Sequence, residues 1–99
     1  MPQPTVTITT PTGNTAIPTP ASGTAFPSAG QTLAGMAYQI DNGPINSFPG
    51  FTPNGGNWGF TLTTSDCPTV NATYLLTVYA GQMPGGGMNT DSTHITRTS

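Results

Sequence analysis

The sequence predicts an all-β protein, folded as a two-sheet Greek-key β-sandwich of about seven short strands. Thr occupies 20 of the 99 positions, and its branched Cβ suits the pleated surface of a strand. Gly and Pro occupy 13 and 11 positions, and both residues favour turns. The apolar residues fall in short runs with a period of two, and no segment has a helical pattern. About seven such runs in roughly 100 residues are typical of a sandwich. The chain is read as one domain, residues 1–99, with a short Pro-rich N-terminal arm, residues 1–4.

The first half of the chain predicts four of these strands. Residues 5–10 alternate Thr with Val6 and Ile8, and residues 23–26 form a weaker strand. The prolines between them favour an edge position, because proline cannot donate a ladder hydrogen bond. Residues 36–41 form the third strand, and Asn42-Gly43 predicts a tight hairpin turn into a return strand at 44–48.

The second half predicts three more strands and the residues of the core. Trp58, Phe60 and Leu62 alternate with small residues, which predicts a half-buried strand. Residues 73–80, which include Tyr74 and Leu76, are apolar on both faces and predict a central strand. We expect a loop at 81–89 and a last strand at 92–97. We expect the core or structural residues to be Trp58, Phe60, Tyr74 and Leu76.

Charge and cysteine content exclude several classes of function. The chain has 3 Asp, one Arg, no Glu and no Lys, whereas a nucleic-acid binder needs Lys and Arg to displace counterions. The same shortage argues against an electrostatic membrane anchor. One cysteine cannot close an intramolecular disulfide, and it is too few for a structural zinc site. We therefore expect neither nucleic acid nor membrane as a partner.

The residues that could carry chemistry do not form a motif. Cys67 and His94 could act as nucleophile and base, but they lie on separate elements without a nucleophile turn. Asp41, Asp66 and Asp91 fall on three different connections with no Asp-x-Asp spacing, whereas calcium needs six or more oxygen ligands. We expect no enzyme activity, no cofactor and no metal. A calcium site with one Asp and backbone carbonyls stays an alternative.

Two predicted loops carry apolar side chains suited to contact with a partner. Phe48 and Phe51 flank Pro49-Gly50, and rigid aromatic side chains make good contact anchors because they lose little entropy on binding. The alternative is that both rings cap an open end of the sandwich. Met83 and Met88 bracket a Pro-Gly loop and form a second, pliable apolar surface. We expect this loop to lie near residues 27–35 and the N-terminal arm.

Four segments resemble the bacterial and phage immunoglobulin-like domains. They are PTVTITTP at 4–11, YQIDNG at 38–43, GNWGFTL at 56–62 and NATYLLTVYA at 71–80. The resemblance implies that Trp58 fills the core and that Tyr74 is a corner tyrosine, whose hydroxyl bonds backbone a few residues upstream. It departs from the family at Ala72, where glycine is usual. The resemblance implies no catalytic residue.

The resemblance also implies a non-enzymatic structural or binding role. The chain opens with Met and has no secretion signal, so we expect it to reach the outside as a virion component. The expected function is a phage head decoration (cement) protein on the capsid exterior. Its partners would be the major capsid protein and neighbouring copies of itself. One alternative is a spacer or adhesion module of a bacterial surface protein, extracellular or at the cell surface. The other is a carbohydrate-binding module, for which Phe48, Phe51 and Tyr79 would supply aromatic platforms.

Overall fold

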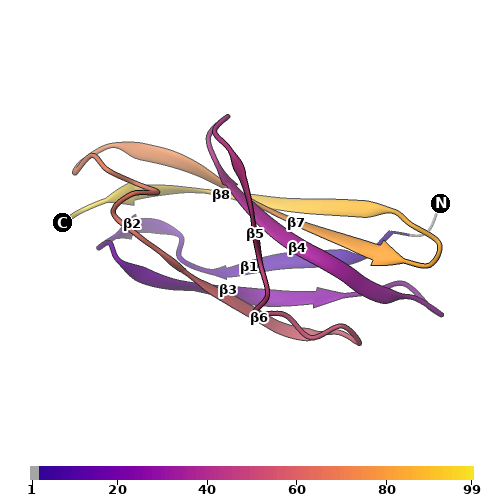
Figure 1. Cartoon of the computed structure of the whole chain (residues 1–99). Coiled ribbons are helices and arrows are strands. Elements are labelled where there is room, and N and C mark those ends of the chain that lie inside the picture. The colour runs from indigo at the N-terminus through magenta and orange to yellow at the C-terminus, as the bar shows by residue number, and fades with distance from the viewer. Residues whose placement is uncertain (1–2) are drawn as a thin grey trace.

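The computed structural model describes residues 3–99 and shows an all-β protein of two sheets, with no helix in that range (Figure 1). No segment of the described chain is therefore a helix that could cross a membrane. The strands are β1 (Thr5–Thr10), β2 (Gly13–Thr15), β3 (Thr19–Phe26), β4 (Thr32–Ile40), β5 (Ile45–Phe48), β6 (Gly56–Leu62), β7 (Thr73–Met83) and β8 (Met88–Arg97).

One sheet has the order β1-β3-β6 and the other has the order β2-β8-β7-β4-β5. All neighbours are antiparallel except β2 and β8, which are parallel. The Pro4 carbonyl, just before β1, accepts a hydrogen bond from Asn89 of β8 near the β7–β8 hairpin, and the C-terminus lies at the other end of the molecule (Figure 1). The prediction of an all-β protein with two sheets is therefore confirmed, and β7 is central, as its two apolar faces indicate.

The predicted first strand, residues 5–10, is β1 with the same bounds, and an unpredicted strand follows it because the chain changes sheets after Thr10. β1 pairs with β3 in one sheet, and after Pro11 the chain continues as β2, which pairs with β8 in the other sheet. The pairing of β1 is already irregular between Ile8 and Thr10. This short parallel strand gives eight strands instead of about seven. A run of three residues is too short to show a period of two in the sequence. β2 is recognised as a strand only because β8 pairs with it.

β3 is longer than predicted and lies at the centre of its sheet, although it contains Pro20. Its pairing with β1 ends at Ser22, while its pairing with β6 continues to Thr19. At Pro20 the strand therefore has a neighbour on one side only. A proline tolerates that position because no ladder hydrogen bond is needed from its nitrogen.

The β4–β5 hairpin turn is wider than the predicted Asn42-Gly43 turn. The last paired residues are Gln39 and Ile45, so five residues connect the strands. The left-handed residue is Asp41, at φ 54°, and its carboxylate accepts a 2.8 Å hydrogen bond from the Leu75 N–H. The hydrogen bond from the Asp41 carboxylate to β7 favours the left-handed conformation of Asp41, and this conformation shapes the turn.

The predicted loop at 81–89 is wrong, because most of it is paired strand. β7 extends to Met83 and β8 begins at Met88, so only residues 84–87 form the turn. Gly81 pairs with Met88, and the Gln82 N–H donates to the Gly87 carbonyl at 3.1 Å. The consecutive glycines 85–87 lie in the turn itself, and the two strands extend up to that turn on both sides.

The core lies between the two sheets and contains a group of four aromatic rings. Tyr38 of β4 stacks on Phe60 of β6 with ring centroids 4.2 Å apart, which joins the sheets. Trp58 is 2% exposed and lies 5.8 Å from both Phe48 and Phe60. Leu76 is fully buried at the centre of β7, while Phe60 is half-buried.

Each edge strand of the three-stranded sheet has a backbone N–H bonded by another part of the chain. On β1, the Ile8 N–H donates to Asp91 Oδ2 of β8 at 2.8 Å. On β6, the Gly59 N–H donates to the Gly50 carbonyl at 2.7 Å. These two bonds tie β8 and the loop after β5 to the edges of the sheet.

Candidate functional site

The end of the sandwich that holds the β7–β8 turn is assembled from three distant segments, which we call the hairpin end. It comprises residues 84–87, residues 27–31 and the arm at Pro4. Gln31 Oε1 accepts from the Gly85 N–H at 2.7 Å, and Asn89 Nδ2 donates to the Pro4 carbonyl at 3.1 Å. The predicted neighbourhood of these loops is confirmed by these bonds.

The polar anchor of the hairpin end is Gln82, which is only 5% exposed. Its Oε1 accepts from both the Ser28 N–H at 2.9 Å and the Ser28 hydroxyl at 3.1 Å. A buried amide that is bonded in this way fixes the neighbouring loop, because breaking the bonds would leave polar atoms unpaired. The hairpin end is therefore a preformed surface.

Large apolar side chains are exposed around the hairpin end. Met83 and Met88 are 51% and 58% exposed, and Phe26 at the end of β3 is 48% exposed. The arm contributes less than expected, since Pro4 is fully buried and residues 1 and 2 lie outside the described chain. The methionines predicted as contacts are thus accessible, and Phe26 is an exposed aromatic ring that the sequence analysis did not select.

The two phenylalanines predicted as contacts are placed differently. Phe48 is 6% exposed and packs against Trp58 and Phe60, so it belongs to the core and not to a contact surface. Phe51 is half-buried against that core. The burial follows from β5, which turns the Phe48 ring inward opposite Met36 of β4. The capping alternative describes these rings better.

A shallow apolar hollow of about 370 Å³ adjoins the hairpin end on the outer side of the five-stranded sheet. Gly35 and Gly81 are paired neighbours without side chains, and Tyr79 and Met88 stand beside them. A second hollow of about 310 Å³ shares Gly35 and continues to Phe51. The hollow exists because β4 and β7 place glycines opposite each other, a pairing that only the fold reveals.

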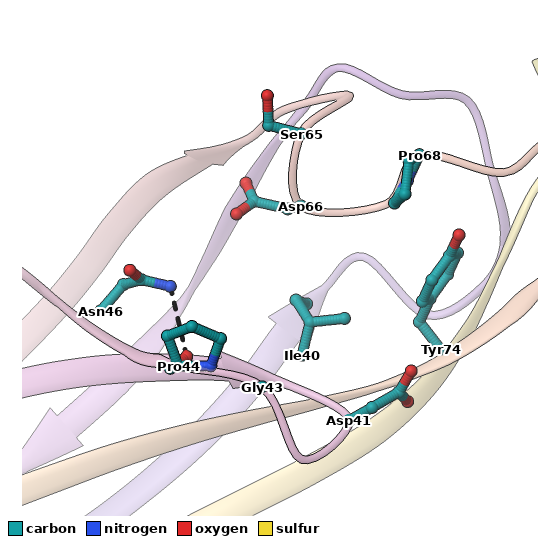
Figure 2. A pocket seen from close by; sticks show the side chains of 9 residues that line it. All are labelled: Ile40, Asp41, Gly43, Pro44, Asn46, Ser65, Asp66, Pro68 and Tyr74. Atoms are coloured by element: carbon teal, nitrogen blue, oxygen red, sulfur yellow. Dashed lines mark hydrogen bonds between the residues drawn. The ribbon is translucent and has the colours of Figure 1, made fainter.

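A further pocket, about 490 Å³, lies toward the other end of β4, between the β4–β5 hairpin and the β6–β7 connection. Figure 2 shows Asp41 on the hairpin and Asp66 on the connection, with Tyr74 beside them. Asp66 accepts three hydrogen bonds, from the Thr63 N–H and hydroxyl and from the Tyr38 hydroxyl. The carboxylates of this pocket therefore hold turns in place.

Tyr74 lies where the chain enters β7. Its hydroxyl oxygen accepts from the Thr69 N–H at 2.8 Å, a bond to backbone five residues upstream. The positive φ of this turn, 69°, belongs to Asn71, one residue before Ala72. The absence of the usual glycine at Ala72 is thus matched by a left-handed asparagine, a residue type that tolerates this conformation.

The groups considered for catalysis and metal binding are separated. Cys67 is fully buried, and burial raises the pKa of its thiol to about 11, whereas His94 is exposed on β8. Asp91 bonds the backbone of β1, away from the pocket that holds Asp41 and Asp66. Within residues 3–99 no three His, Cys or Asp side chains are grouped as metal ligands would be.

The burial of Tyr38 and its bond to Asp66 should make the free energy of unfolding decrease at alkaline pH. Burial, and then the bond to Asp66, raises the pKa of Tyr38 from 10.0 to about 12. A raised pKa means that the unfolded chain releases this proton first. The stabilising contribution is therefore complete below pH 10 and is lost as pH rises toward 12. We expect chemical denaturation curves across this range to show the loss, and Tyr38→Phe to remove part of it.

The control for that measurement is Cys67→Ala, because the Cys67 thiol has its own raised pKa, about 11 instead of 9.0. Cys67→Ala should remove a separate part of the pH dependence, which begins near pH 9. The assignment to Tyr38 would be wrong if Tyr38→Phe left the slope between pH 10 and pH 12 unchanged.

Comparison of the chain with protein-family models, with curated proteins and with solved structures found no match.

Proposed function

We propose that the chain has an immunoglobulin-like Greek-key fold. The strand order supports the proposal: β1, β3 and β6 form one sheet, and β8, β7, β4 and β5 are consecutive in the other. Apart from the parallel β2, both sheets are antiparallel, and long-range connections of this kind are a feature of immunoglobulin-like sandwiches. A first strand divided between the two sheets, a buried tryptophan and a tyrosine bonded to backbone before β7 agree with it.

We infer a non-enzymatic binding role, in which the hairpin end attaches to a protein surface. The observation that carries this is the set of exposed apolar side chains, Phe26, Met83 and Met88, on a surface fixed by Gln82. A rigid aromatic ring loses little side-chain entropy on binding, and methionine adapts its shape to the partner, so both can bury apolar area in a contact. The Asp carboxylates serve hydrogen bonds to backbone.

The setting we propose is the exterior of a phage head, where the chain decorates the major capsid protein. A decoration protein needs a stable fold and an apolar attachment surface, and it needs no catalytic residue. The proposal therefore assigns attachment to the hairpin end.

The test is attachment of the purified chain to undecorated phage heads, measured by co-sedimentation. We expect saturable binding that changes little between roughly 50 mM and 500 mM salt, because the contact is apolar. Met83→Asp should weaken attachment at least about tenfold, since it places a charge in the contact. The matched control is Thr61→Asp on β6, at an exposed position of the other sheet.

Two results would contradict the proposed role. The first is the absence of binding to any capsid surface by a folded chain. The second is saturable binding to a polysaccharide that Phe51→Ala abolishes, which would make the chain a carbohydrate-binding module. Equal loss of attachment in Met83→Asp and Thr61→Asp would place the contact away from the hairpin end.

A further inference from the structure

The outer side of the five-stranded sheet, which we call the outer face, carries odd-numbered residues of β7 and their partners on β4, β5 and β8. Three of the five exposed large apolar side chains of the described chain stand on it: Ile45 at 59%, Met83 at 51% and Met88 at 58%. Their register places them there, because Ile45 pairs with Gln39, and Met88 pairs with Gly81.

Several polar side chains of the outer face are bonded to one another. The Tyr79 hydroxyl donates to Gln39 Oε1 at 2.6 Å. Thr77 and Ser92 share a 3.0 Å hydroxyl bond across β7 and β8. A partner that offers no hydrogen bonds can cover such groups at low cost, since their bonds survive the loss of water. The outer face is therefore suited to being buried.

The charges of the chain lie away from the outer face. Asp41 and Asp66 line the pocket between the β4–β5 hairpin and the β6–β7 connection, Asp91 bonds β1, and Arg97 donates to the Cys67 carbonyl at 2.9 Å. In a two-fold interface, a group near the symmetry axis meets its own copy, so a like charge there is unfavourable. His94 pairs with the odd-numbered Leu75 and is an exposed residue of the outer face, toward the C-terminal end of β8. Apart from this imidazole, the outer face carries neither the Asp side chains nor Arg97.

We propose that the outer face binds a second copy of this chain in a two-fold symmetric dimer. β7 and β8 pair over nine positions, and with β4 and β5 the face measures about 30 by 19 Å from strand spacings, or roughly 600 Å² in projection. The side chains standing on it bring the accessible area near the roughly 800 Å² that each partner contributes to a standard interface.

The geometry within the face is self-complementary. The hollow over Gly35 and Gly81 has Met88 at its rim, and Ile45 stands on the neighbouring edge strand. Two-fold packing places protruding side chains of one copy against the hollow of the other. Stacked sheets lie about 10 Å apart, which suits the small residues Ala37 and Ser47 between them. Met88 belongs to both surfaces, so the dimer would use Met88 and leave Phe26 and Met83 for attachment of the hairpin end.

Sedimentation equilibrium of the full chain tests the dimer. We expect the mass to rise from the 10.1 kDa of one chain to twice that value between about 1 μM and 1 mM, with little effect of salt. Ala37→Asp, at the centre of the face, should raise the dimer Kd at least about tenfold. Thr61→Asp on the other sheet should leave it unchanged.

Circular dichroism of each variant establishes that it is folded, and Ser47→Asp is a second variant on an exposed position of the face. A chain that stays monomeric to about 1 mM would overturn the proposal. So would a dimer that Thr61→Asp disrupts and both outer-face variants spare. The Ala37→Asp variant should also be tested for attachment to phage heads. Normal affinity per chain in this variant would show that the dimer interface and the attachment site are different surfaces.

Discussion

Replacing Gly23 by alanine is expected to lower the free energy of unfolding by about 3 kcal/mol or more. Gly23 lies in β3, the central strand, where it pairs with Ile8 on one side and Trp58 on the other. An added Cβ would overlap the Thr7 carbonyl oxygen and lie 2.7 Å from Trp58 Cζ2. The backbone oxygen cannot move without breaking the β1–β3 ladder, so the strain falls on the whole sheet.

Urea denaturation followed by circular dichroism measures this loss. The matched control is Gly35→Ala, another strand glycine, whose added Cβ meets nothing within 4 Å. We expect Gly35→Ala to change stability by less than about 0.5 kcal/mol, as surface substitutions usually do. Equal effects of the two substitutions would show that β3 does not approach β1 and Trp58 as closely as described.

Trp58→Ala is expected to cost about 3–5 kcal/mol, enough to unfold most of a domain of marginal stability. The indole is 2% exposed, contacts the rings of Phe48 and Phe60, and donates from Nε1 to the Thr24 carbonyl at 3.0 Å. Alanine leaves a cavity between the sheets and a carbonyl without its partner. Both the cavity and the unpaired carbonyl destabilise the folded state.

Circular dichroism follows this variant, because the substitution removes the only tryptophan. Trp58→Phe keeps an aromatic ring and loses the N–H donor, so it should cost less than Trp58→Ala. Blue-shifted emission of the unmodified protein checks the burial independently. Red-shifted emission from folded protein, with a cost of Trp58→Ala below about 1 kcal/mol, would contradict a core position for Trp58.

The sequence alone predicted the fold class and the positions of most strands, because alternation of apolar and small residues encodes which side of a strand is buried. Trp58 and Leu62 lie inward, as the period of two in β6 indicates. The two apolar faces of residues 73–80 likewise predicted a central strand. Each of these patterns lies within a few consecutive residues, so it can be recognised from the sequence without knowing which strands pair.

The tertiary structure alone decided the boundaries and the surface. β2 exists because β8 offers a partner, and residues 81–83 are strand because β8 and β4 continue beside them. Phe48 had the sequence context of a loop anchor, yet its partner on β4 turns it into the core. The hollow over Gly35 and Gly81 depends on residues 46 positions apart in the chain. Pairing between distant segments sets such features, and no short stretch of sequence contains both partners.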